Sequence, residues 1–377
     1  MTNWICDDLE MILAMNRLPE YLLPFLCAAF VTGCNPHGTR ITIEPVTFNH
    51  PDEVIKGSGD AKGCMALADR RVFAVMAFLN TAGYDQEVSN MQMHPVRVKV
   101  RKMISDNLSN QPEKLHAWRR YYKDNLLGAW QYTNWSLSLN SDFPFRRIRP
   151  DKELTYSWTS WMLADFPNIL NDFWTTAHLE EVWAECRDDY YAELKRCNPN
   201  ETAQGINFVW QYMRMPRKDN YIIIRIPNPL ERYATANGNR FEHYFYSVEG
   251  PGSGGYVHEY LHTFVNDLVK INYASQKSKL RKYFNAGRDA AISSSYQEPV
   301  NWISECLVHA LDYRITTMRV SEPTLEKRLE DKVNKLTQGG YIVLKPLYTL
   351  LIDFEKSDKP FDQYLPIMLE KLPEYSP

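Results

Sequence analysis

Two histidines four residues apart, with a glutamate after the first, place the strongest constraint on how this chain folds. The stretch GGYVHEYLHTFVND covers residues 254–267 and holds His258, Glu259 and His262. On a helix, positions i and i+4 share one face about one turn apart, so both imidazoles can reach one metal ion. Glu259 lies beside them, where it can take a proton from water. The pattern predicts a helix that carries a zinc site.

The residues around this motif favour a buried helix over a solvated one with scattered histidines. An apolar stripe follows the helical period, and the preceding glycines suit a turn that leads into a helix. The stripe consists of Val257, Leu261, Phe264, Val265 and Leu268. Unpaired imidazoles are costly in a buried helix, which favours the metal site.

A catalytic zinc site needs a third protein ligand and an open position for water. Val265 and Leu268 stand where a metzincin would have Gly and His, which excludes that class. The best candidate is Glu305, which lies in the apolar helical stretch EPVNWISECLVHALDYRI, residues 298–315. A carboxylate in such a helix needs a partner, and zinc would supply one. The alternative partner is an arginine, such as Arg314 or Arg281.

Several further residues are candidates for supporting roles in such a site. His309 and Asp312 follow Glu305 by four and seven residues, on the same helix face. Either could orient a ligand or replace Glu305 as a ligand, although His309 can also be an ordinary core or surface histidine. Tyr313, Tyr341 and His309 are open candidates for stabilising an oxyanion.

The combination of HEYLHTFVND with NWISECLVHALDYR resembles a family of bacterial lipoproteins that contain a gluzincin-like domain of unknown function. LADFPNILNDFW is similar to the aromatic-rich region of that family, and the resemblance spans roughly residues 65–350. It implies a thermolysin-like catalytic core with Zn²⁺ on His258, His262 and Glu305, and with Glu259 as the base. Such gluzincins often carry Asp four residues after the ligand Glu, where this chain has His309. The resemblance implies no particular substrate.

The N-terminal segment predicts a lipid-anchored protein. MNRLPEYLLPFLCAAFVTGC, residues 15–34, has Arg17, an apolar run, and small residues before Cys34, as in a bacterial lipoprotein signal peptide. The apolar run is too short to span a bilayer. Because residues 1–14 are acidic, we expect the true start near Met15, or at Met11, with cleavage after residue 33 and lipidation of Cys34. The alternative is a buried helix of the folded domain.

Composition describes a globular protein of 377 residues with 44% hydrophobic and 13% aromatic residues. The formal charge of −3 gives no reason to expect a nucleic-acid partner. The cysteines after Cys34 show no CxxC spacing, which argues against a zinc ribbon. Cys186 and Cys197 are near enough in sequence to pair in an oxidising periplasm.

We expect an α+β fold, mostly helical, with a small mixed sheet next to the HExxH helix. After a signal peptide at 1–33 and a tether at 34–62 come a helical region at 63–200 and a metallopeptidase-like region at 201–377. Helices are expected at 67–84, ending at Gly83, and at 95–108, 112–130 and 156–196. Strands are expected at 205–215, 220–230 and 242–250.

These features predict a zinc-dependent metallopeptidase that is lipid-anchored in the bacterial cell envelope and acts on a peptide or protein. Residues 242–248 would present a strand edge to which an extended peptide could add. The alternative is a non-catalytic envelope lipoprotein that keeps the fold and binds a peptide or glycan. A hydrolase of another bond has the same ligand set.

Overall fold

The computed structural model describes residues 53–84, 94–125, 127–154, 157–217, 219–241, 243–294, 296–320 and 322–375. The expected signal peptide, Cys34 and the tether up to residue 52 lie outside these ranges. Within them, no helix combines the length and the apolar character that crossing a membrane requires.

The sheet has five strands in the order β1-β2-β3-β5-β4. The strands are β1 Val54–Lys56, β2 Cys64–Leu67, β3 Ile222–Pro227, β4 Ala236–Phe241 and β5 Tyr244–Glu249. β2, β3 and β5 run parallel, and β1 and β4 pair antiparallel at the two edges. The sheet is therefore mixed, as expected.

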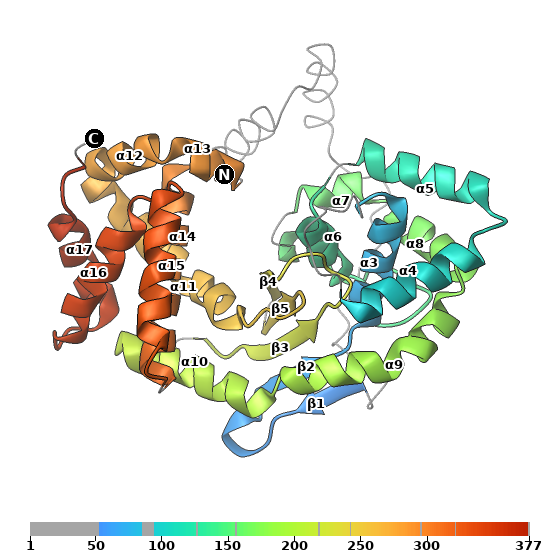
Figure 1. The fold of residues 1–377 in the computed structure, drawn as a ribbon, viewed down its shortest axis with the longest axis horizontal. Coiled ribbons are helices and arrows are strands. Elements are labelled where there is room, and N and C mark those ends of the chain that lie inside the picture. The colour runs from blue at the N-terminus through green and yellow to red at the C-terminus, as the bar shows by residue number, and fades with distance from the viewer. Residues whose placement is uncertain are drawn as a thin grey trace, which may run out of the picture.

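Helices make up most of the fold, which confirms a mostly helical α+β protein. The first group comprises α3 Arg70–Ala82, α4 Pro95–Asn107, α5 Pro112–Asp124, α6 Ala129–Ser136, α7 Thr159–Met162, α8 Phe166–Thr176 and α9 Leu179–Arg196. The second comprises α10 Pro199–Met213, α11 Tyr256–Tyr273, α12 Lys277–Ala286, α13 Arg288–Ser293, α14 Pro299–Arg319, α15 Leu325–Gln338, α16 Leu344–Glu355 and α17 Phe361–Lys371. Figure 1 shows the sheet between the two groups.

The sheet separates two hydrophobic cores. Successive side chains of a strand point to opposite faces, and Ile224 and Ile226 of β3 pack into the core of the first helix group. Ile223, which precedes Ile224 along the strand and points to the opposite face, packs into the core of the second group. Burial on both faces explains why the central strands read as nearly continuous apolar runs in the sequence.

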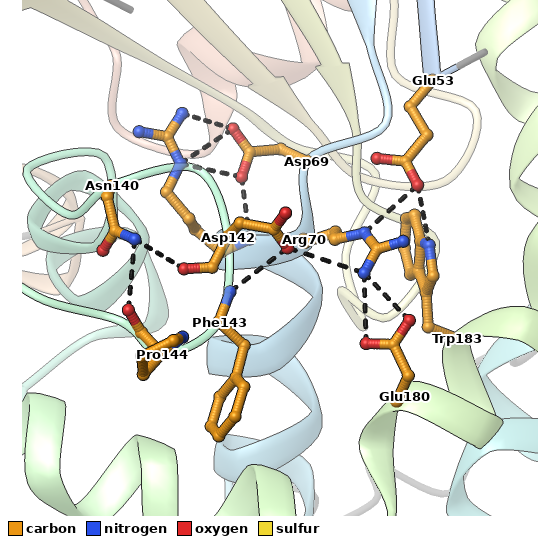
Figure 2. Close-up of polar contacts among 10 residues, drawn as sticks. Glu53, Asp69, Arg70, Asn140, Asp142, Phe143, Pro144, Glu180 and Trp183 are labelled. Atoms are coloured by element: carbon orange, nitrogen blue, oxygen red, sulfur yellow. Dashed lines mark hydrogen bonds and ion pairs between the residues drawn. The ribbon is translucent and has the colours of Figure 1, made fainter. Parts of the chain in front are cut away.

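Polar contacts at the start of α3 fasten the first helix group to the sheet edge (Figure 2). Arg70 donates to Glu53, just before β1, at 3.2 Å and to Glu180 of α9 at 3.1 Å. Glu53 also accepts a hydrogen bond from the indole of Trp183 at 3.0 Å. The next residue, Arg71, forms a buried ion pair with Asp69 at 2.6 Å. The segment before β2 is thus part of the fold.

Three expectations about elements were wrong. Residues 54–56 form a strand rather than the end of a tether, and the helical region expected from residue 63 opens with β2. The strand expected at 205–215 is the C-terminal part of α10. Its buried residues Ile206, Val209 and Met213 recur at helical spacing, and their β-branched and aromatic neighbours favoured a strand only by propensity.

The structure also corrects the expected strand edge and shows the state of two cysteines that the sequence left open. β5, which contains residues 244–249, lies between β3 and β4, so the edge on this side of the sheet belongs to β4 and not to β5. Cys186 and Cys197 are free, buried thiols. They lie at the middle and the end of α9, roughly 16 Å apart by helical rise, whereas a disulfide needs Cα atoms within about 7 Å.

Candidate metal centre

The predicted HExxH helix is α11, and the second candidate helix is α14, which packs along it. α11 begins after Gly255, at the end of the glycine-rich turn that follows β5. Its buried side includes Val257, Leu261 and Val265, as the apolar stripe predicted. The hydroxyl of Tyr260 accepts from Trp210 of α10 at 2.8 Å and donates to Asp219 before β3. These contacts hold α11 in a fixed rotation about its axis.

The three predicted ligands converge on one point. His258 Nε2 lies 3.3 Å from His262 Nε2. The carboxylate of Glu305 reaches both rings, with Oε2 at 3.1 Å from His262 Nε2 and Oε1 at 3.5 Å from His258 Nε2. Glu305 is only 7% exposed, so its carboxylate has left bulk water.

These distances suit a tetrahedral metal ion. Zinc binds imidazole nitrogen and carboxylate oxygen at about 2.0–2.2 Å, so two ligands of one tetrahedral ion stand roughly 3.3–3.5 Å apart. The two histidine nitrogens stand 3.3 Å apart, and each lies 3.1–3.5 Å from an oxygen of Glu305, His258 from Oε1 and His262 from Oε2. Two imidazoles and one carboxylate are also a known set of three protein ligands in catalytic zinc sites.

His309 extends this cluster. Its Nε2 lies 3.1 Å from Glu305 Oε1, and the donor atoms of His258, Glu305 and His309 all lie within 4.8 Å of one another. Its other nitrogen, Nδ1, is buried and has no hydrogen-bond partner within the described part of the chain. His309 could therefore serve as a further ligand of a metal ion, or hydrogen-bond to Glu305.

An arginine does not take the place of a metal beside Glu305. Arg314 makes a bidentate pair with Glu355 at 2.6 and 2.7 Å, and also contacts Glu326 at 3.2 Å. Among the residues that the structure describes, the salt-bridge partners of Glu305 are His258, His262 and His309. The arginine alternative is therefore wrong for Arg314.

The pKa values of His258, His262 and Glu305 reflect the attraction between the imidazoles and the buried carboxylate. Burial disfavours a charged imidazole, but the hydrogen bond to Glu305 and the nearby carboxylate charges, that of Glu305 foremost, together outweigh burial and raise the pKa of His258 to about 9. The pKa of His262 is raised for the same reasons. Burial opposes ionisation of Glu305, yet hydrogen bonds from three histidines hold its pKa well below the usual range. In the metal-free protein, protonated His258 and His262 therefore balance the negative charge of Glu305.

Glu259 lies beside the ligands without joining them. Its Oε2 accepts a hydrogen bond from the backbone N–H of Gly238 in β4 at 2.8 Å. Burial raises the pKa of Glu259, and the charges of His258 and His262 oppose that shift. A carboxylate with a raised pKa next to a metal site suits a general base.

The other supporting candidates differ in where they lie. Asp312 is close enough to His258 and His309 for their charges to act on it, but burial raises the pKa of its carboxyl. The buried hydroxyl of Tyr313 has no described hydrogen-bond partner, and Tyr341 donates to Ser294 at 2.9 Å. The Tyr341 ring lies 6.0 Å from that of His309.

Sequence reasoning missed Tyr296 and Gly238. Burial, together with the charge and hydrogen bonding of the Glu305 carboxylate, raises the pKa of Tyr296, which places this phenol beside Glu305. It stands three residues before α14, in a segment with no periodic pattern, and only its closeness to the helix of Glu305 could have drawn attention to it. Gly238 belongs to β4, whose sequence ANGNRF is rich in residues that are rare in strands.

Comparison with known proteins identifies no relative. No family model matches the chain, and no curated protein or solved structure is significantly similar to it. The resemblance to gluzincin-like lipoproteins therefore stays an expectation, and any chemistry must be argued from the residues themselves.

Proposed function

We propose that this protein is a zinc-dependent metallopeptidase of the gluzincin type. The observation that carries the proposal is the convergence of His258, His262 and Glu305 from two helices, with donor atoms 3.1–3.5 Å apart. Structural zinc sites are closed by four protein ligands, whereas three nitrogen and oxygen donors leave a position for water. The adjacent Glu259 adds the base that simple metal storage does not require.

In the proposed reaction, each residue of the site has a separate role. Zinc, when bound, would act as a Lewis acid toward a carbonyl and would acidify water. Glu259 would remove the proton from the attacking water and pass it to the leaving amine. Tyr296, whose phenol lies beside Glu305, is the favoured donor to the developing oxyanion, ahead of Tyr313 and Tyr341. Its raised pKa keeps the phenol protonated, which a donor needs.

The free edge of β4 is the favoured place for the substrate. α11 packs beside β4, and β4 ends the sheet (Figure 1). An extended peptide can add to an open edge by main-chain hydrogen bonds, which are indifferent to side chains. Such a peptide would lie next to Glu259, which already occupies the N–H of Gly238, so the peptide would bond to the other outward-facing main-chain groups of β4. This supports a peptide rather than another class of bond as the substrate.

The proposed setting is the bacterial cell envelope, with the protein held by a lipid on Cys34. The support is the sequence pattern before Cys34 alone. A peptidase anchored in this way would act on peptides or proteins at the membrane surface.

The test compares metal binding with catalysis in the full chain. Elemental analysis of purified protein should give about one zinc per chain, and zinc-loaded wild type should cut members of a peptide library read by mass spectrometry. Glu259→Gln keeps the shape of the side chain and removes its charge. We expect its zinc content to stay the same and hydrolysis to fall at least about 100-fold, in line with general base catalysis.

His258→Ala serves as the matched contrast, because it should lose zinc and activity together. A Glu259→Gln variant that cuts as fast as wild type would refute the mechanism even with zinc present. Zinc-loaded wild type that cuts no peptide would favour the non-catalytic binding protein instead.

A further inference from the structure

We propose that the backbone N–H of Gly238 is the positioning group for Glu259, and that this role requires glycine at position 238. The catalytic consequence rests on the proposed function, but the contact itself does not. Gly238 N donates to Glu259 Oε2 at 2.8 Å, across 21 residues of sequence. Within the described ranges, no other group donates a hydrogen bond to this carboxylate.

The contact depends on the place of Gly238 in the sheet. β4 is an edge strand, and Gly238 lies opposite Ser247 of β5 in the antiparallel register. The N–H of an edge residue either joins the ladder or points away from it. That of Gly238 is directed at α11, where it meets the carboxylate. A main-chain donor in a sheet is far more rigid than a side-chain donor, so it can hold the base in one orientation.

Glycine is required because the side chains of Glu259 and Phe245 lie close against position 238. A Cβ at position 238 would stand 2.9 Å from Glu259 Cβ and 3.1 Å from its Oε2. It would also stand 3.2 Å from the ring of Phe245 on the neighbouring strand. An alanine would therefore push the glutamate away from its donor.

The two carboxylate oxygens of Glu259 therefore have different roles in the proposed reaction. Oε2 is held by β4, so Oε1 is left to face the water that Glu259 would deprotonate. A base that must lie within hydrogen-bond reach of its proton gains from being fixed in this way, since a displacement of about 1 Å can cost roughly 100-fold in rate.

The contact can be tested without metal or substrate. Selective ¹⁵N-glycine labelling gives at most 16 backbone signals, few enough to assign Gly238 by substitution. We expect its amide proton to be shifted downfield and protected from exchange in wild type. In Glu259→Ala it should move upfield and exchange on the order of tenfold faster or more. Gly250, whose N–H donates to Thr235 O at 2.7 Å, should not change.

The kinetic test uses two substitutions at position 238. Gly238→Ala adds a Cβ and keeps the N–H, whereas Gly238→Pro also removes the N–H, which an edge strand tolerates where the N–H does not join the ladder. We expect both variants to bind zinc. kcat should fall in both, and roughly a further 10- to 100-fold in the proline variant, with KM nearly unchanged.

The outcomes separate this proposal from the proposed function. An unchanged Gly238 amide in Glu259→Ala would overturn the positioning role, and so would equal acceleration at Gly250, because Glu259 would then stabilise the sheet as a whole. Equal kcat in the alanine and proline variants would also overturn it. A changed Gly238 amide in a protein that cuts no peptide would leave the contact established and would refute only the peptidase.

Discussion

Glu305 and His309 face each other one turn apart on α14, with Glu305 Oε1 3.1 Å from His309 Nε2. The same carboxylate contacts His262 through its other oxygen at 3.1 Å. His309 and His262 thus contact different oxygens of the Glu305 carboxylate. Its role as a ligand or as a hydrogen-bond partner of a ligand is open to a direct test.

We expect His309→Ala to weaken zinc binding without abolishing it. A residue that orients a metal ligand typically contributes about 10- to 100-fold to affinity, whereas loss of a ligand removes the metal. Competition with a chelator of known affinity would measure the difference. His262→Ala is the control for the loss of a true ligand. Equal loss of zinc in both variants would make His309 a ligand.

Tyr296→Phe should lower kcat and leave KM and zinc content almost unchanged. Removal of one oxyanion donor typically costs about 100- to 1,000-fold in kcat, because the donor acts mainly in the transition state. Steady-state kinetics on a peptide cut by wild type would show it. Tyr341→Phe is the matched control, since its hydroxyl already donates to Ser294 at 2.9 Å. A larger fall in kcat in Tyr341→Phe than in Tyr296→Phe would make Tyr341, and not Tyr296, the oxyanion donor.

The metal-free protein should lose stability as the pH rises from about 6.5 to about 9. The pKa of His258 is raised in the folded state from its ordinary 6.5 to about 9. The folded state therefore binds the proton more tightly, and this contribution is complete below pH 6.5 and lost as the pH passes 9. Urea unfolding of metal-free protein at pH 6 and pH 9.5 would measure the change.

Saturating zinc should reduce this pH dependence, because zinc binds neutral imidazole and displaces the protons. His258→Gln should reduce it as well, since the titrating ring is then absent. A metal-free wild type that becomes more stable between pH 6.5 and 9 would contradict the expected charge balance at Glu305.

Cys34 should carry lipid when the full chain is expressed in a bacterial host. The small residues Val31, Thr32 and Gly33 precede it after an apolar run, as in a lipoprotein signal. Labelled palmitate should enter wild type and not Cys34→Ser. Equal labelling of the two proteins would show that the pattern is accidental.

The sequence by itself determined the elements whose signals are local. Helical spacing of apolar residues predicted α11 and α14, and the i, i+4 rule put His258 and His262 on one face. Apolar strands β3 and β5 were also predicted, because both are buried on two faces. The choice of Glu305 followed from the energy of leaving a carboxylate unpartnered in an apolar helix.

Only the tertiary structure decided what depends on contacts between distant segments. The polar, glycine-containing strand β4 has little intrinsic preference for a sheet, and pairing with β5 creates it. α10 read as a strand by propensity, and its packing between the sheet and α11 made it a helix. The donor to Glu259 is a backbone N–H, which every residue except proline carries, so no residue pattern could reveal that Gly238 would supply it.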